Sequence, residues 1–252
     1  MGKIAVFDSG LGGLTVLSEL MKLMPGEDYI YFGDSANAPY GDKTPDELEA
    51  LCKNVCRRLL EADEIKCFVI ACNTTTARIL DRLERDFPTV PFIGIEPAVA
   101  EAAEHEPGKN ILVLATTGTV NSNRLRERIN GLKDKACFRA LAAPGIVPYI
   151  EGFMPDRGKF RDYLKDLLKD HSRDTDAVVL GCTHFPFVKE ELRECFDKDI
   201  RFYDAAGGVA LRVKELLKNK GDLKAGQNGS ICFMNSDPDK IKLEERLLNE
   251  YK

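Results

Sequence analysis

Short apolar runs alternate with amphipathic segments along all 252 residues of the chain. A fully buried strand of a parallel sheet reads as such an uninterrupted apolar run. Strands that alternate with helices form units with parallel sheets, so the pattern places the chain in the α/β class. The runs predict strands at residues 3–8, 28–32, 67–72, 91–95, 110–115, 136–141, 177–182, 200–203 and 231–234.

Segments with helical spacing separate these strands. Thr44-Pro45-Asp46-Glu47 combines a capping box with a proline at the first helical position, and an apolar stripe from Leu48 to Leu59 follows it. The Gly10–Thr15 turn opens a helix that continues to about Met24. Further helices are predicted at about residues 75–86, 122–132, 157–170, 207–218 and 238–249, and one begins at about residue 189.

The two halves of the chain repeat each other. The pairs Ile4/Ile111, Ile30/Arg139, Cys72/Cys182 and Phe92/Arg201 are separated by 107, 109, 110 and 109 positions. Right-handed crossovers place the carboxyl ends of all strands on one side of each sheet. We therefore expect two pseudo-symmetric parallel-sheet α/β domains that face each other across the active site. The first would comprise residues 1–96 plus 206–252, and the second residues 97–205.

The charge pattern and the termini restrict the possible partners. The net charge is −5 with both signs interspersed, which argues against a nucleic-acid-binding surface. No apolar run approaches the roughly 18 residues of a membrane span. The N-terminus has no signal-peptide pattern, and Val6 occupies the Ser/Thr position of a myristoylation site. We expect a cytoplasmic protein that binds neither nucleic acid nor a membrane.

The chain has eight cysteines without disulfide-framework or paired CxxC spacing, so we expect reduced thiols. Cys52 and Cys56 lie four apart and could suit a metal, but no other ligand cluster accompanies them. We therefore expect no metal site. Packing in the interior is the interpretation for six of the eight: Cys52, Cys56, Cys67, Cys137, Cys195 and Cys232.

The other two cysteines end apolar runs. Cys72 is followed by Asn73 and Thr74, and Cys182 by Thr183-His184. Ligands of open α/β sheets bind just beyond the carboxyl ends of the strands. Inversion of a carbon stereocentre needs a base on one face and a proton donor on the other, which two opposed thiols can supply. A helix N-terminus after each cysteine would favour its thiolate and could hold a substrate carboxylate.

The glycines at positions 10, 12 and 13 also suggest a dinucleotide-binding turn. However, Thr15 stands where the third glycine belongs, and the charge of Asp8 would repel a pyrophosphate. The acidic residue about 20 positions further on, Asp34, lies inside Gly33-Asp34-Ser35 and leads into a loop. We therefore expect a tight strand-to-helix turn and no cofactor.

Five motifs, in this order, span essentially the whole chain. They are Asp8-Ser9-Gly10-Leu11-Gly12-Gly13, Gly33-Asp34-Ser35, Pro39-Tyr40-Gly41, Cys72-Asn73-Thr74 and Gly181-Cys182-Thr183-His184-Phe185-Pro186. Together they closely resemble the motifs of the cofactor-independent glutamate racemases, within the aspartate/glutamate racemase superfamily. Two positions depart from that pattern: Asn37 stands where many members have an arginine, and Asp204-Ala205-Ala206 replaces a more usual Asp-Ser.

The resemblance implies an isomerase that interconverts L- and D-glutamate without pyridoxal phosphate or metal and supplies D-glutamate for peptidoglycan, and hence for cell wall biogenesis and cell shape. It implies that Cys72 acts on the α-proton of the D-isomer and Cys182 on that of the L-isomer. Asp8 would assist the first thiol and His184 the second. The implied substrate-binding residues are Asp8, Ser9, Tyr40, Gly41, Asn73, Thr74, Thr119, Thr183 and His184.

The resemblance also implies that the partners are the small-molecule substrate and a second copy of the chain in a homodimer. Two alternatives stay open. One is a racemase of the same superfamily for aspartate or another amino acid, because the sequence does not reveal the length of the pocket. The other is a non-catalytic module that binds amino acids or another protein.

Overall fold

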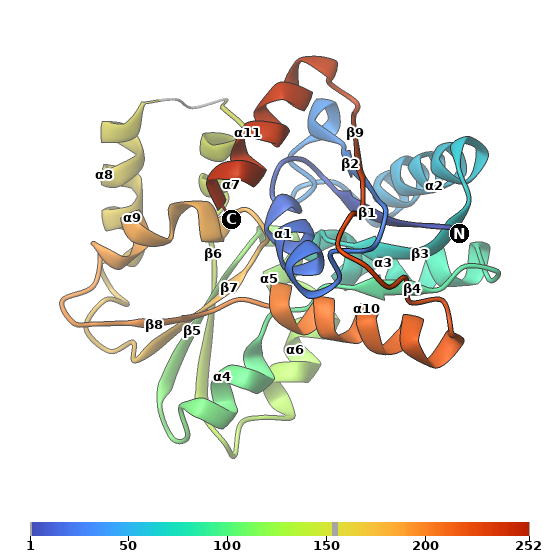
Figure 1. The fold of residues 1–252 in the computed structure, drawn as a ribbon. Coiled ribbons are helices and arrows are strands. Elements are labelled where there is room, and N and C mark those ends of the chain that lie inside the picture. Colours follow the sequence, from blue (N-terminus) through green and yellow to red (C-terminus); the bar gives the residue numbers. More distant parts are fainter. Residues whose placement is uncertain (1, 153–155, 252) are drawn as a thin grey trace.

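The computed structural model describes residues 2–152 and 156–251, and it contains two α/β units side by side (Figure 1). All strand pairings among these residues are parallel, which confirms the predicted fold class. The first sheet has the order β4-β3-β1-β2-β9, with β1 at Lys3–Asp8, β2 at Tyr29–Gly33, β3 at Ile65–Ile70, β4 at Phe92–Gly94 and β9 at Ile231–Asn235. The second has the order β6-β5-β7-β8, with β5 at Asn110–Ala115, β6 at Cys137–Ala142, β7 at Ala177–Gly181 and β8 at Arg201–Tyr203.

The two sheets repeat one strand order, which reads β4-β3-β1-β2 in the first and β8-β7-β5-β6 in the second. This order confirms the internal repeat predicted from the sequence. One of the four predicted correspondences is off by a residue. Phe68 pairs with Phe92, and Val178, the equivalent of Phe68 in the second unit, pairs with Phe202. Phe92 therefore corresponds to Phe202 and not to Arg201. Strand β9 pairs with β2 and has no counterpart in the second sheet among the residues that the structure describes.

Helices cover both faces of the first sheet because its strands are apolar on both faces. In β1, Ile4 and Val6 belong to one core cluster, and Ala5 and Phe7 belong to the other. This alternation follows from the two-residue period of a strand. The first cluster packs under α1 (Leu14–Leu23), α10 (Ala206–Lys220) and α11 (Ile241–Tyr251), and the second under α2 (Pro45–Ala62) and α3 (Asn73–Asp86).

The second sheet is built in the same way. One face packs against α7 (Ile146–Ile150), α8 (Arg157–Leu168) and α9 (Lys189–Arg193), and the other against α4 (Val99–His105) and α6 (Asn123–Asn130). A short helix, α5 (Thr117–Val120), follows β5. Three 3₁₀ turns complete the described elements: η1 (Ser35–Asn37), η2 (Phe185–Val188) and η3 (Pro238–Lys240).

Several local predictions are confirmed. The capping box of α2 is present: Thr44 Oγ1 accepts a hydrogen bond from the Glu47 amide, and the Glu47 carboxylate accepts one from the Thr44 amide at 2.7 Å. Helices α4 and α7 were not predicted, since α4 has only seven residues and α7 contains a proline, Pro148. The domain boundaries near residues 96 and 205 stay a prediction.

The packing interpretation of the six other cysteines holds only in part. Cys52, Cys56 and Cys67 are buried, and Cys195 is half-buried. For Cys137 and Cys232 the interpretation is wrong, because both are exposed. The physical reason is that they lie in β6 and β9, which are edge strands of the two sheets. In the described ranges, no helix has both the length and the apolar character needed to cross a membrane.

Candidate active site

A pocket lies between the two units at the carboxyl ends of their strands. Its empty space is about 460 Å³, a volume that includes open solvent. The first unit contributes Ser9, Pro39, Tyr40, Gly41, Asp42, Cys72, Asn73 and Thr74, and the second contributes Thr116, Thr117, Pro144, Val147, Cys182, Thr183 and His184. The two cysteines singled out from the sequence therefore line the same pocket, one from each unit. Their positions match, because Cys72 follows β3 and Cys182 follows the equivalent strand β7.

Cys72 is the N-cap residue of α3, and its thiol donates a hydrogen bond to Ser9 Oγ at 3.6 Å. Burial, assisted by the charge of Asp8, raises the pKa of Cys72 to about 11. Hydrogen bonds from the Thr75 hydroxyl and amide act in the opposite direction. The expected effect of the helix N-terminus is thus present, but burial outweighs it, so Cys72 is a protonated thiol at neutral pH.

Asp8 ends β1 beneath the pocket and links the two units. One carboxylate oxygen accepts the Gly13 amide at 2.9 Å, and the other accepts the Thr183 hydroxyl at 3.4 Å. Complete burial raises the pKa of Asp8 to about 6, although the nearby His184 acts to lower it. A carboxyl group with this pKa can take up or release a proton close to neutral pH.

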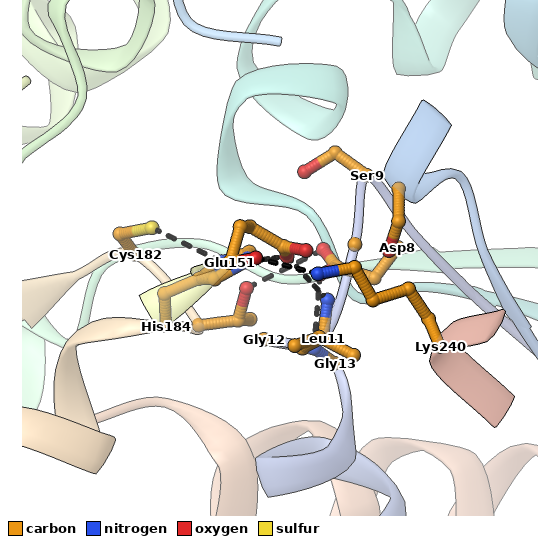
Figure 2. Close-up of polar contacts among 12 residues, drawn as sticks. Asp8, Ser9, Leu11, Gly12, Gly13, Glu151, Cys182, His184 and Lys240 are labelled. Atoms are coloured by element: carbon orange, nitrogen blue, oxygen red, sulfur yellow. Dashed lines mark hydrogen bonds and ion pairs between the residues drawn. The ribbon is translucent and has the colours of Figure 1, made fainter. Parts of the chain in front are cut away.

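His184 links the second thiol to a buried carboxylate. Its Nδ1 lies 3.9 Å from Cys182 Sγ, and its Nε2 lies 2.7 Å from Glu151 Oε1 (Figure 2). Burial alone would lower the pKa of His184, but hydrogen bonds with Cys182 and Glu151 raise it well above its usual value. Burial likewise acts to raise the pKa of Glu151, yet the bond and charge of His184 keep it below its usual value. The two side chains therefore form a buried imidazolium–carboxylate pair.

The imidazolium–carboxylate pair of His184 and Glu151 packs against the glycine turn at residues 10–13. A Cβ atom at Gly10 would lie 1.9 Å from Glu151 Oε1, and one at Gly12 would lie 2.2 Å from His184 Nδ1. The Leu11 amide donates to Glu151 Oε1 at 2.7 Å. The carboxylates of Glu151 and Asp8 thus accept hydrogen bonds from the Leu11 and Gly13 amides, which such a turn could otherwise use to bind a phosphate. This agrees with the interpretation as a strand-to-helix turn.

The opposite wall is rich in hydroxyl and amide groups. Thr74 Oγ1 lies 2.7 Å from Thr116 Oγ1 across the two units, and Thr116 also donates to Thr119 at 3.1 Å. Asn73 is 4% exposed, and neither atom of its side-chain amide has a hydrogen-bond partner among the described residues. Buried amides are normally satisfied, so Asn73 is placed to bind a polar ligand. The hydroxyl of the buried Tyr40 donates to Asp34 at 2.5 Å.

The structure brings the site residues predicted from the sequence together, but two of them lie beneath the residues that line the pocket. Asp8 and Thr119 are fully buried and lie outside the lining of the pocket. In the lining are Ser9, Tyr40, Gly41, Cys72, Asn73, Thr74, Cys182, Thr183 and His184.

Glu151 and Thr116 also belong to this site, although neither was predicted from the sequence. Glu151 had a visible signal, because it is the only charged residue between Arg139 and Asp156. Thr116 had one as well, because the offset of 107 that relates Ile4 to Ile111 also relates Ser9 to Thr116.

Comparison with known proteins gives the family. A family model described as Asp/Glu/Hydantoin racemase matches residues 15–210. The chain belongs to this racemase family. Glutamate racemases of Clostridium novyi and Halothermothrix orenii are 38% and 37% identical to it. The first match covers 97% of this chain and 96% of the relative, and the second covers 99% and 97%.

Solved structures agree with this assignment. A glutamate racemase isoform of Bacillus anthracis superposes with a TM-score of 0.86 at 28% identity, covering 98% of this racemase and 94% of the other chain. The Escherichia coli glutamate racemase in complex with L-glutamate and the activator UDP-MurNAc-Ala gives 0.85 at 29% identity, covering 100% and 96%. The protein is therefore a racemase, and hence an isomerase, with the fold of the glutamate racemases.

Proposed function

We propose that this racemase interconverts L- and D-glutamate by moving the α-proton between two thiols. The observation that carries the proposal is that Cys72 and Cys182 line one pocket from equivalent strand ends of two facing units. Relatives named glutamate racemases match nearly the whole chain, which supports glutamate as the substrate.

In the L-to-D direction, the thiolate of Cys182 removes the α-proton of L-glutamate. The Cα–H bond breaks, an S–H bond forms, and the electron pair on Cα spreads into the α-carboxylate. The thiol of Cys72 then donates its proton to the opposite face, which forms the new Cα–H bond and leaves a thiolate. No atom is oxidised or reduced, so the reaction requires no redox cofactor. The reverse reaction exchanges the roles of the two sulfurs.

The surroundings of the two thiols fit the L-to-D direction at neutral pH. The raised pKa of Cys72 keeps it protonated and ready to donate. The imidazolium of His184 lies beside Cys182 and would pair with the thiolate formed there. Asp8, whose pKa is about 6, is the neighbour that would receive the Cys72 proton when the D-isomer is the substrate.

The remaining polar groups would hold the substrate. Asn73 offers an unpartnered amide, and the first turn of the 14-residue α3 presents backbone N–H groups suited to a carboxylate. Ser9, Thr74 and Thr183 add hydroxyl groups around the same space. Such preorganised donors would stabilise the charge that develops on the α-carboxylate in the transition state.

The test is incubation with L-glutamate in D₂O without added cofactor, following optical rotation and α-proton NMR together. Loss of rotation with deuterium at Cα is the expected result. The same assay with L-aspartate decides the substrate: faster turnover of aspartate would replace glutamate in the proposal. If neither amino acid exchanges its α-proton in a folded, reduced sample, the catalytic proposal is wrong, and ligand binding without exchange would identify a binding module.

We further propose a cytoplasmic homodimer that supplies D-glutamate for peptidoglycan synthesis. This role rests on the likeness to glutamate racemases. Expression of the gene in a bacterium that requires D-glutamate should restore growth without the supplement, and light scattering should give twice the mass of the chain. Failure of growth with active enzyme present would contradict the physiological role, and a monomer mass would contradict the dimer.

A further inference from the structure

The C-terminal segment of the first unit reaches the catalytic centre of the second. After β9 the chain forms the turn η3 and then α11, and Figure 2 shows Lys240 of this segment together with Asp8, Leu11, Gly13 and Glu151. From the end of η3, Lys240 Nζ donates to the backbone carbonyl of Glu151 at 2.6 Å. Glu151 is the carboxylate that binds His184, so this bond joins the two units next to the acid–base pair.

Several hydrogen bonds fix the turn that carries Lys240. The Ser236 amide donates to the Gly33 carbonyl at 3.0 Å, and the Asp237 amide donates to the Asn235 side chain at 2.8 Å. Asn235 in turn donates to Glu244 Oε1 at 2.6 Å. The turn that carries Lys240 is therefore fixed to the first sheet, while the ammonium group of Lys240 binds the second unit.

Glu244 completes this anchor without adding charge. Its side chain is fully buried against Gly33, where a Cβ atom would lie 2.6 Å from the carboxyl oxygen. Burial raises the pKa of Glu244 to about 8, although the bond from Asn235 opposes the shift. Burial thus favours the neutral form of Glu244, whereas the charge of Lys240 acts to lower the pKa of Glu151.

We propose that Lys240 is a positioning residue of the racemase, which holds Glu151 in place through its backbone carbonyl so that Glu151 keeps the His184 imidazolium beside Cys182. This role rests on the proposed function, since it serves the second thiol. Other titratable groups close to the pair are Asp8 on β1, Tyr31 on β2, Cys182 after β7 and Glu244 on α11. Lys240 differs from them because it contacts the backbone of Glu151 from the other unit.

Lys240 has two opposite effects on the pKa of His184. The sign of the net change therefore distinguishes a positioning role from a purely electrostatic one. Loss of a nearby positive charge would by itself raise the pKa of His184. Loss of the contact that holds Glu151 would loosen the carboxylate that stabilises the imidazolium, and so would lower that pKa. The positioning role predicts that the pKa falls when the ammonium group is removed.

The experiment compares Lys240→Met with Lys240→Arg and with Lys242→Met, which changes an exposed lysine of the adjacent helix α11. The pKa of His184 is read from imidazole NMR signals, which are few because the chain has three histidines. Assignment uses His184→Gln. In Lys240→Met the pKa of His184 should fall by half a unit or more, kcat should drop about tenfold, and KM should stay within about twofold. Lys240→Arg and Lys242→Met should resemble the wild type.

A double-variant cycle tests whether Lys240 acts through Glu151. In a Glu151→Gln background, Lys240→Met should change kcat by less than about twofold. Additive losses, a higher pKa of His184 in Lys240→Met, or an unchanged pKa would each overturn the proposal. The NMR titration needs no turnover, so a wild type that fails to racemise glutamate would contradict the proposed function and leave the titration as an independent test of Lys240.

Discussion

The two thiols occupy equivalent positions in repeated units, yet their surroundings differ. Cys72 caps a 14-residue helix and is accompanied by hydroxyl groups and the carboxyl group of Asp8. Cys182 precedes a 3₁₀ turn and is accompanied by an imidazole, which the carboxylate of Glu151, the C-cap residue of α7, supports. The first setting favours a thiol, and the second offers a cation for a thiolate.

This difference shows what the repeat does and does not determine. The common strand order places a sulfur at each side of the pocket. In the proposed mechanism, the residues around each sulfur set which proton-transfer role it takes at neutral pH. The two enantiomers of the proposed substrate would then meet a site that is symmetric in topology and asymmetric in charge.

Replacement of either thiol should have the largest effect. Cys72→Ser and Cys182→Ser should each lower kcat/KM by about 10⁴-fold or more, because a serine hydroxyl is a far weaker acid than a thiol. Enantiomers have equal free energy in water, so kcat/KM falls equally in both directions. Deuterium uptake distinguishes the variants: Cys72→Ser should label only L-glutamate, and Cys182→Ser only D-glutamate.

The matched control for the thiols is Cys137→Ser, which changes an exposed cysteine of an edge strand and should keep wild-type turnover. Wild-type-like turnover in either pocket variant would contradict the two-thiol mechanism. Labelling of both enantiomers by one variant would contradict the assignment of one sulfur to each face.

Removal of the Asp8 charge should have the next largest effect. Because burial raises the pKa of Asp8 to about 6, its carboxylate form is lost as the pH falls through 6. The kcat/KM of the wild type should therefore decline below about pH 6. Asp8→Asn should lower kcat/KM about 10³-fold and abolish this decline. The pH profiles of the two enzymes are the measurement, with the exposed Asp162→Asn as control. If kcat/KM still declines below about pH 6 in Asp8→Asn, a group other than Asp8 causes the decline.

Glu151→Gln tests the role of the carboxylate that pairs with His184 beside Cys182. It keeps the shape of the residue but removes the negative charge that pairs with His184, so kcat should fall about 100-fold and the pKa of His184 should decrease. Steady-state kinetics and the imidazole titration measure both effects. The exposed Glu194→Gln provides the control on the same unit. A pKa of His184 equal to that of the wild type would mean that the pair is not an ion pair.

Thr116→Val should have the smallest effect. It removes the hydroxyl that lies 2.7 Å from Thr74 Oγ1 at the contact between the two units but leaves both thiols and their partners in place. We expect KM for L-glutamate to rise about threefold with kcat nearly unchanged, on the scale of one neutral hydrogen bond. Thr89→Val, at an exposed position, should leave KM unaltered. A large loss of kcat in Thr116→Val would mean that the hydroxyl contributes to the chemical step.

The sequence was most informative where burial and repetition act together. Buried parallel strands leave apolar runs, and two runs that end in cysteine at matching positions located both thiols. The correspondence between the first four strands of the two units followed from nearly constant offsets, although Phe92 was matched one residue off and the order of the strands within each sheet was not predicted. Helix α2 was equally clear, because its capping box uses local residues only.

Other features depend on contacts between distant segments, which one sequence does not encode locally. Glu151 and Leu11 are 140 positions apart, and nothing near either residue indicates their hydrogen bond. The exposure of Cys137 and Cys232 depends on which strands form the sheet edges, which is a property of the assembled topology. The net pKa of Cys72 likewise depended on burial, which overrode the helix effect visible in the sequence.

The pairing of β9 with β2 has a consequence for how the molecule is made. The strands of the second unit come from one continuous stretch, residues 110–203, whereas the first sheet needs residues 231–235 beside residues 29–33. During synthesis the second unit can fold while the first still lacks an edge strand and α11. Residues 231–240 leave the ribosome after both cysteines, Asp8, Glu151 and His184, so the contact of Lys240 with Glu151 forms later in synthesis than the segments that carry the two thiols.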